Sequence, residues 1–337
     1  MLLDSFGRKL DYLRISVTDR CNQRCVYCMP PEGVKWKPHD SLLRFEEILR
    51  LCRVMAELGI SRIRVTGGEP LVRRGVAAFL KGLKLIHGVK KVSLTTNGFF
   101  LGAYLDEAEA LSPASFPDCI NISLDALDVE RFKRITRTEN FNPMDVLPII
   151  DRLLEKQILV KLNCVPVRGL NEEELLPLAA LARDRNISVR FIELMPLGSA
   201  GGFKPISGSE TAAQIERAFG LLTPFPGVEG SGPAEYFSLP GFAGKIGFIN
   251  PLSRGFCGSC NRLRLSSDGK LKPCLSDVKF LDLKTMLRSG ASDEALAEAV
   301  KEAVSKKPRH HNLSPIYGAP EGESGNFHKD GMFGIGG

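Results

Sequence analysis

Residues 12–28 organise this chain and read YLRISVTDRCNQRCVYC. The first six residues alternate between apolar and polar side chains, a pattern that predicts a β-strand. The loop after this strand carries Cys21, Cys25 and Cys28 within eight residues. An odd number of cysteines cannot pair off completely as disulfides, whereas three thiolates on one loop can bind a single metal centre. The sequence therefore predicts a metal site at the end of the first strand.

Zinc, copper(I) and iron–sulfur clusters all accept soft thiolate ligands. A structural zinc site has four protein ligands, but no fourth Cys or His lies close to this loop, His39 being the nearest. A four-iron cluster bound by three cysteines keeps one iron open, and an open iron can bind a substrate. The loop favours such a cluster and leaves zinc as the alternative.

Composition restricts the class of protein. The 337 residues suffice for one large domain and a smaller one, and 43% hydrophobic with 25% charged residues is typical of globular proteins. The net charge of +6 fits an anionic ligand such as a nucleotide. No apolar run predicts a membrane span, and the N-terminal residues lack a signal-peptide pattern. Nine cysteines without an export signal predict a cytoplasmic protein with metal chemistry.

Strand and helix patterns alternate along the first 194 residues. Strands are predicted at residues 12–17, 62–66, 91–96, 119–125, 159–165 and 188–194. Helices are predicted at residues 42–58, 76–86, 103–111 and 172–183, and shorter helical stretches follow the fourth strand up to about residue 154. Six strand–helix units suit an α/β fold with a partial (β/α)₆ barrel of the TIM type. A Rossmann-type sheet has the same alternation, and periodicity alone does not exclude it.

Polar clusters follow the predicted strands, at the end where barrel enzymes carry their active sites. They are the cysteine loop, residues 67–70 (GGEP), residues 95–98 (TTNG), Asp125, Asn163 and residues 193–195 (ELM). The two glycines of residues 67–70 allow the backbone to approach a ligand closely. We therefore expect these segments to surround one site.

A second group of cysteines, Cys257, Cys260 and Cys274, lies near the C-terminus. Its spacing also occurs in zinc ribbons, but a fourth ligand is again missing, because the nearest later histidines lie in another segment (residues 310–311). We interpret this group as a second cluster, with zinc as the alternative. Cys52, Cys119 and Cys164 fall in apolar helix and strand patterns, and we expect them to be buried without a metal role.

Arg262 and Arg264 lie directly after Cys260, on a predicted strand. Alternate side chains of a strand share a face, so both guanidinium groups should point the same way. Two permanent charges with fork geometry beside a metal centre suit a triphosphate.

These motifs resemble those of the radical S-adenosylmethionine (SAM) enzymes, whose signature is Cys-x₃-Cys-x₂-Cys with an aromatic residue before the last Cys. The branch they resemble is the family of GTP 3′,8-cyclases (MoaA) of molybdenum cofactor biosynthesis. The matching strings are RISVTDRC (residues 14–21), CVYCMP (25–30), IRVTGGEPL (63–71), TTNG (95–98), NISLD (121–125), RFIELMP (190–196), the second cysteine triad and the terminal Gly336-Gly337. The likeness extends along nearly the whole chain.

The resemblance implies two domains and two metal centres. Residues 1–235 would form the barrel with SAM on a [4Fe–4S] cluster, and residues 236–337 a C-terminal α+β extension with a second [4Fe–4S] cluster. The implied cluster ligands are Cys21, Cys25 and Cys28 for the first and Cys257, Cys260 and Cys274 for the second. The implied SAM contacts are Tyr27, Gly68, Ser123 and Met195. The implied GTP contacts are Arg14, Arg64, Thr95, Lys161, Arg190, Arg262, Leu263 and Arg264, with Arg262 and Arg264 also assigned to catalysis.

The implied reaction is the first step of molybdopterin synthesis, which converts GTP to (8S)-3′,8-cyclo-7,8-dihydroguanosine 5′-triphosphate. One-electron cleavage of SAM would give a 5′-deoxyadenosyl radical, and this radical would remove H3′ of GTP. The C3′ radical would then attack C8 of guanine, and reduction of the resulting radical by one electron and one proton would give the product. The implied partners are GTP, an external electron donor, a second copy in a homodimer and cyclic pyranopterin monophosphate synthase, which receives the product. The resemblance implies neither a membrane nor a nucleic acid.

One departure from the family lies in the tail. The family tail usually reads Arg-x-Met-x-x-Ile-Gly-Gly, whereas Asp330 replaces that arginine here. If the arginine helps the tail to dock in the active site, docking here uses Lys329 or is weaker.

Two alternatives of different classes remain at this point. A peptide-modifying radical SAM enzyme with an auxiliary cluster would usually carry more cysteines near its C-terminus. A zinc-binding protein without enzymatic activity would leave the strand-end polar residues unexplained.

Overall fold

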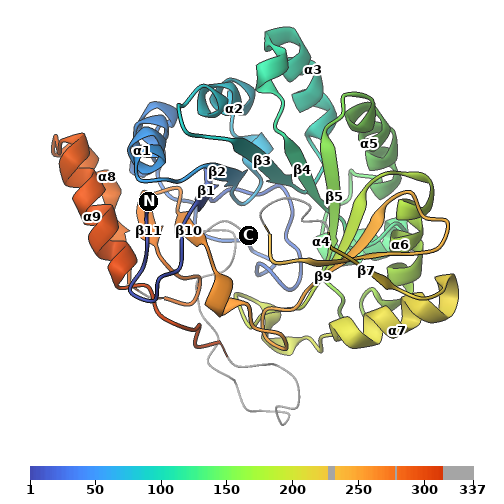
Figure 1. Cartoon of the computed structure of the whole chain (residues 1–337). Helices are drawn as coiled ribbons and strands as arrows, with labels where there is room; N and C mark the ends of the chain where they lie inside the picture. The colour runs from blue at the N-terminus through green and yellow to red at the C-terminus, as the bar shows by residue number, and fades with distance from the viewer. Residues whose placement is uncertain (227–231, 278, 314–337) are drawn as a thin grey trace.

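A computed structural model describes residues 1–226, 232–277 and 279–313. In these residues one curved sheet of 12 strands forms the centre of the molecule, and helices cover its outer face (Figure 1). Eight neighbouring strands are parallel, in the spatial order β10 (Arg262–Leu265), β1 (Tyr12–Ser16), β2 (Arg62–Thr66), β3 (Lys91–Thr96), β4 (Cys119–Ser123), β5 (Leu159–Cys164), β6 (Ser188–Ile192) and β9 (Lys245–Ile249). Antiparallel strands extend both edges, with β11 (Lys270–Lys272) and β12 (Leu281–Asp282) beyond β10, and β8 (Glu235–Ser238) and β7 (Thr223–Phe225) beyond β9.

The helices pack their apolar sides toward the sheet. In α1, for example, Ile48, Leu51 and Met55 are buried at helical spacing. The helices are α1 (Phe45–Glu57), α2 (Val76–Lys84), α3 (Leu101–Leu111), α4 (Val129–Thr136), α5 (Val146–Glu155), α6 (Leu175–Asp184), α7 (Gly208–Phe219), α8 (Leu283–Arg288) and α9 (Asp293–Ser305). Helix α9 lies outside α1, so the end of the described chain returns to its beginning (Figure 1).

The strand order confirms the predicted partial barrel. Strands β1 to β6 are neighbours in chain order and all run parallel. A Rossmann-type sheet would reverse its strand order at a switch point, so that alternative is excluded. The predicted bounds of β2 and β3 are correct, whereas the other four predicted strands end one or two residues earlier.

The C-terminal segment continues the same sheet at both edges. Strand β10 pairs with β1, where Tyr12 faces Arg262, and β9 pairs with β6, where Ser188 faces Lys245. The sequence predicts the strand that carries Arg262 and Arg264, which is β10, but not its partner. The domain division after residue 235 stays a prediction, and the tail with Asp330 lies outside the described residues.

The register of the strands sorts their side chains into layers. Arg264, Arg14 and Arg64 occupy matching positions on β10, β1 and β2, and all three face the barrel interior. One residue earlier, Leu263, Leu13 and Ile63 also match, and these three belong to the hydrophobic core. Because side chains alternate along a strand, a charged inner layer and an apolar outer layer come from the same strands.

The loop after the first cysteine triad is fastened to the turn between β10 and β11. Lys37 Nζ lies 2.7 Å from Asp268 Oδ2, and Ser266 donates a 2.6 Å hydrogen bond to the same carboxylate. Burial by itself would raise the pKa of Asp268, but these two partners outweigh it and lower the pKa to about 2. The carboxylate therefore stabilises the fold at pH values above its ordinary pKa, and this stabilisation is lost as the pH falls toward 2.

We expect Asp268→Asn to lower the free energy of unfolding by about 1–2 kcal/mol near pH 7, after allowance for the partly exposed Lys37. The difference from wild type should stay constant from pH 7 to pH 5 and shrink below pH 4, as urea unfolding at each pH would measure. Glu235→Gln, which removes an exposed ion pair with Arg254, is the matched control and should change stability little. Equal losses in the two variants would contradict this assignment.

Candidate active site

A cavity of about 350 Å³ opens at the carboxyl ends of the parallel strands. Its wall contains all six cysteines of the two triads, together with Tyr12, Arg14, Tyr27, Arg64, Gly68, Glu69, Thr95, Ser123, Asp125, Arg190, Glu193, Met195, Arg262, Arg264, Lys307 and His311 among others. Its volume is typical of small-molecule sites. The prediction that the strand-end clusters surround one site is therefore confirmed.

The first triad lies on a loop that backbone hydrogen bonds fix against the end of α4. The amides of Arg24 and Val26 donate to carbonyls of the last α4 residues, at 2.8 Å and 2.9 Å. Cys21, Cys25 and Cys28 are partly exposed, and all three line the cavity. Burial raises the pKa of Cys21 to about 11 and that of Cys25 well above its usual value. Binding of a cluster would therefore have to displace protons from these thiols.

The second triad is assembled by the antiparallel pair β10–β11. Cys257 and Cys260 precede β10, and Cys274 follows β11, so the hairpin returns Cys274 toward the other two cysteines. All three are partly exposed and line the cavity. Burial would raise the pKa of Cys260, but Lys307 and Arg262 outweigh it and lower this pKa. This triad therefore has a more positive environment than the first.

Zinc and a four-iron cluster need different donor geometries. Tetrahedral zinc would need sulfurs within about 4 Å of one another, since Zn–S bonds are about 2.3 Å long. In a four-iron cluster each thiolate binds a different iron, so the sulfurs lie farther apart. Across residues 1–226, 232–277 and 279–313, no three His, Cys, Asp or Glu side chains are grouped as the ligands of one metal ion are. The kind of metal centre at the second triad stays a prediction.

Four of the arginines on the cavity wall, Arg14, Arg64, Arg262 and Arg264, bring positive charges close together. Burial lowers the pKa of Arg14, and the charges of Arg264, Arg64 and Arg262 lower it further. Burial, followed by the charge of Arg262, lowers the pKa of Arg264 to about 10. An anionic ligand would relieve this mutual repulsion between the guanidinium groups. Arg262 and Arg264 both line the cavity and therefore share one face of β10, as predicted.

Several polar atoms of the cavity wall are buried without a hydrogen-bond partner in the part of the chain that the structure describes. They include Tyr12 Oη, Gln23 Nε2, Thr95 Oγ1 and Glu193 Oε1. Native proteins rarely leave buried polar atoms unsatisfied. Their position indicates that a polar ligand completes this cavity.

The four residues assigned to SAM all lie on the cavity wall: Tyr27, Gly68, Ser123 and Met195. Tyr27 donates a short hydrogen bond from its hydroxyl to Asp125. Burial raises the pKa of Asp125 to about 6, even though this hydrogen bond acts in the opposite direction. The sequence had placed Asp125 at a strand end without a role.

Two residues assigned to GTP do not line the cavity. Leu263 is fully buried in the outer apolar layer. Lys161 is buried too, and its ammonium donates a 3.0 Å hydrogen bond to Tyr236 Oη.

Arg190 does line the cavity, and its guanidinium donates to Asn121 and Asn163, both at 2.6 Å. Gly247 makes room for Arg190, since a Cβ there would lie 2.9 Å from Arg190 Cγ.

Sequence reasoning missed Glu69 as a structural link between two strand ends. Its carboxylate accepts hydrogen bonds from Thr96 Oγ1 at 2.8 Å and from the Asn97 amide at 2.7 Å. Burial raises the pKa of Glu69 to about 7. Sequence reasoning also gave Lys307 no role, and it set His311 aside because that residue lies in a different segment from the second triad. The structure places residues 307–313 against the second triad, where Lys307 and His311 line the cavity.

The prediction that Cys52, Cys119 and Cys164 are buried holds for two of them. Cys52 and Cys164 belong to the hydrophobic core. Cys119 is only partly buried, because it begins β4 at the opposite end of that strand from the cavity.

Gly68 sets the distance between two loops of the site. Its amide donates to Thr18 at 2.8 Å, and a Cβ at this position would lie 2.3 Å from the carbonyl oxygen of Arg20. We expect Gly68→Ala to displace the entrance to the cysteine loop, lower stability by about 2–3 kcal/mol, and reduce both iron uptake at the first triad and SAM affinity. Thermal unfolding, iron analysis and SAM titration would measure these changes.

Gly102→Ala is the matched control, because a Cβ there lies 3.7 Å from its nearest neighbour, on the side chain of Ile149. It should leave iron uptake unchanged and stabilise α3 slightly. A Gly68→Ala variant with wild-type stability and SAM affinity would contradict the close approach.

Comparisons with known proteins identify the class. Residues 15–182 match the Radical SAM superfamily. The fold is similar to that of Streptococcus suis SuiB in its crystal structure with S-adenosylmethionine, with a TM-score of 0.59 and 14% identity over 86% of this chain and 67% of that one. The chain is a radical SAM enzyme, a class with a [4Fe–4S] cluster and bound SAM.

Closer relatives narrow the class to one family. A protein of Moorella thermoacetica named GTP 3′,8-cyclase is 46% identical over 324 residues, which cover 95% of this chain and 98% of the relative. One of Desulforamulus reducens with the same name is 44% identical, with coverages of 93% and 95%. Residues 187–313 match the Molybdenum Cofactor Synthesis C family. The chain belongs to the GTP 3′,8-cyclase family, as the motifs had predicted, and the peptide-modifying alternative is not favoured.

Proposed function

We propose that the two cysteine triads of this GTP 3′,8-cyclase hold two [4Fe–4S] clusters that share one cavity, with SAM at the first and GTP at the second. One observation carries this proposal: both triads and the four arginines line the same cavity. A radical must form within about 3–3.5 Å of the hydrogen that it removes. A shared cavity allows SAM and the ribose of GTP to meet at that distance.

In this proposal Cys21, Cys25 and Cys28 would hold the first cluster, which when bound would supply the electron for cleavage of SAM to methionine and a 5′-deoxyadenosyl radical. Four wall residues then hold SAM, namely Tyr27, Gly68, Ser123 and Met195. Gly68 leaves its backbone open to the ligand. The hydrogen bond from Tyr27 to Asp125 fixes the tyrosine ring beside the triad.

The second triad, Cys257, Cys260 and Cys274, would leave one iron open for the guanine of GTP. Arg14, Arg64, Arg262 and Arg264 are suited to bind the triphosphate, because their charges repel one another without it. Thr95 supplies a hydroxyl that lacks a partner within the described residues. Arg262 and Arg264 would also orient GTP for catalysis.

Two of the remaining residues assigned to GTP, Leu263 and Lys161, would act through the residues that they contact. Leu263 anchors β10 in the core, so that Arg262 and Arg264 keep their direction. Lys161 holds Tyr236 by a hydrogen bond. Arg190, fixed by two asparagines, presents a positive charge to the cavity wall.

Within the described residues no helix is both long and apolar enough to cross a membrane. The family supports further proposals: a cytoplasmic location, a homodimer, an external electron donor and transfer of the product to cyclic pyranopterin monophosphate synthase. The barrel and the C-terminal extension, divided after residue 235, would carry one cluster each.

Anaerobic incubation with SAM, a strong reductant and GTP tests the proposal. We expect 5′-deoxyadenosine and 3′,8-cyclo-7,8-dihydro-GTP in equal amounts, and about eight irons per chain after reconstitution. ATP in place of GTP is the control and should give no cyclised nucleotide. Formation of 5′-deoxyadenosine with GTP unchanged, or cyclisation by protein with about four irons, would contradict the proposal.

A further inference from the structure

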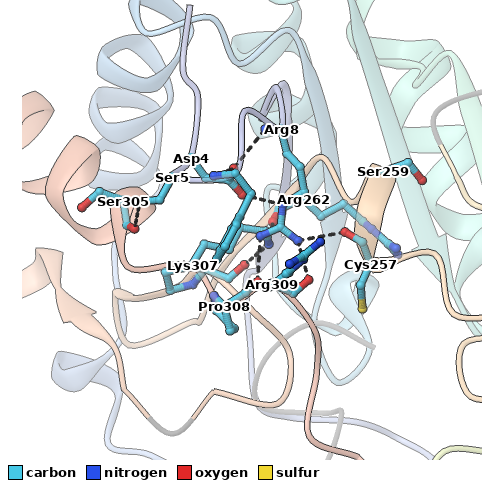
Figure 2. Close-up of polar contacts among 12 residues, drawn as sticks. Asp4, Ser5, Arg8, Cys257, Ser259, Arg262, Ser305, Lys307, Pro308 and Arg309 are labelled. Atoms are coloured by element: carbon cyan, nitrogen blue, oxygen red, sulfur yellow. Dashed lines mark hydrogen bonds and ion pairs between the residues drawn. The ribbon is translucent and has the colours of Figure 1, made fainter.

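Lys307 lies beside the second triad, although it follows α9 in a segment with no predicted structure. Its side chain is buried, with 3% of the residue exposed. The ammonium donates a 3.0 Å hydrogen bond to the carbonyl oxygen of Arg262 and a shorter one to that of Pro273. Figure 2 shows Lys307 beside Arg262 in this arrangement.

These two carbonyls belong to the segments that carry two of the cysteines. Arg262 comes two residues after Cys260, and Pro273 directly precedes Cys274. One ammonium therefore holds the two strands of the β10–β11 hairpin at the end where the thiols lie. The same ammonium is close enough to interact electrostatically with Cys260 and Cys274.

Lys307 has no carboxylate among its hydrogen-bond partners in residues 1–226, 232–277 and 279–313. A buried ammonium is costly unless a negative charge or full hydrogen bonding compensates it. The other charged groups that act on it most strongly, Arg8 and Arg262, are positive. The thiols of the second triad are therefore the groups that can supply the negative charge, once they bind metal as thiolates.

Arg8 fixes the segment around Lys307 from the N-terminal loop. Its guanidinium is held by Asp4 at 2.5 Å and donates to the carbonyls of Pro308 at 2.7 Å and Arg309 at 3.0 Å. It also donates to the carbonyl of Cys257 at 2.8 Å. Figure 2 shows these contacts converging from the two ends of the described chain. Together, Arg8 and Lys307 contact the backbone within two residues of each of the three cysteines.

We propose that Lys307 is a positioning residue of the second triad, which spaces Cys260 and Cys274 through the two carbonyls and compensates their thiolate charge when a cluster is bound. Arg8 contacts the backbone of Cys257 and of the two residues that follow Lys307, and it thereby fixes Lys307 relative to Cys257. The inference rests on the proposed second cluster. A fixed cation beside a cluster favours its reduced form, so Lys307 also raises the reduction potential of that cluster relative to an uncharged residue.

The test compares Lys307→Met, Lys307→Gln and Lys307→Arg in the full chain after anaerobic reconstitution. Iron and sulfide per chain report whether the second cluster forms, and redox titration followed by electron paramagnetic resonance gives the potential of each cluster. Lys306→Met is the matched control, because Lys306 is the adjacent lysine, is exposed and pairs with Glu302. Circular dichroism verifies that each variant is folded.

We expect Lys307→Met and Lys307→Gln to lose iron toward about four per chain, or to keep the second cluster at a more negative potential. Lys307→Arg should restore iron content and potential, and Lys306→Met should match wild type. The first cluster should keep its potential in every variant. Arg8→Met should partly reproduce the loss of iron, because the Lys307 segment is then released.

Three results would overturn the proposal. Wild-type iron content and potential in Lys307→Met would show that the ammonium has no role at the triad. Equal iron losses in Lys307→Arg and Lys307→Met would show that its charge is not the cause. Wild-type protein with only about four irons would refute the second cluster itself, which is a failure of the proposed function and is visible without any Lys307 variant.

Discussion

Replacement of Arg262 and Arg264 together by alanine is expected to weaken GTP binding about 100-fold or more, because each substitution removes a charge-assisted contact with the triphosphate. The affinity for SAM and the iron content of the first triad should change little. Anaerobic equilibrium dialysis with GTP and with SAM would measure both affinities. The double lysine variant keeps the two charges but loses the fork geometry, so its GTP affinity should lie between those of wild type and the alanine variant.

Arg254→Ala is the matched control for this experiment. Arg254 is an exposed arginine of the same C-terminal segment, paired with Glu235 at 3.0 Å. It should bind GTP as wild type does. If the double alanine variant is folded and keeps wild-type GTP affinity, these two arginines do not bind the triphosphate.

Cys25→Ala and Cys274→Ala are expected to remove different functions. Cys25→Ala should lose about four irons and all formation of 5′-deoxyadenosine, because the first triad then has two ligands. It should still bind GTP. Cys274→Ala should also lose about four irons and should lose GTP affinity and cyclisation, whereas SAM remains bound at the intact first triad.

Cys52→Ala controls for the loss of a cysteine as such. Cys52 is a core residue outside both triads, so its replacement should cost only packing energy, about 1 kcal/mol, and leave iron content unchanged. Iron analysis, product analysis and GTP titration on the three variants give the comparison. Loss of 5′-deoxyadenosine formation in Cys274→Ala to the same extent as in Cys25→Ala, with the first cluster intact, would contradict the division of roles.

The fold was largely predictable because its signals are local. Alternating strand patterns and amphipathic helices located all six strands of the barrel and most helices. The shared face of Arg262 and Arg264 followed from alternation along a single strand. Both triads were visible because cysteine spacing is itself a sequence pattern.

The features that the sequence did not predict depend on contacts between residues far apart in the chain. Strand β10 lies beside β1 although 250 residues separate their first positions, and no periodicity encodes that choice. This pairing puts Arg264 beside Arg14 and turns Leu263 toward the core. Lys307 lies in a polar segment without periodicity, and its hydrogen-bond partners are 45 and 34 residues away. Only the folded chain brings these residues to the second triad.

The central claim is that a radical formed at the first triad acts on GTP held at the second, within one cavity. GTP carrying deuterium at C3′ tests it directly, because the hydrogen removed from the ribose can be traced by mass spectrometry. The account predicts deuterium in 5′-deoxyadenosine and its loss from the cyclised nucleotide. Unlabelled 5′-deoxyadenosine together with deuterium retained in the product would contradict it.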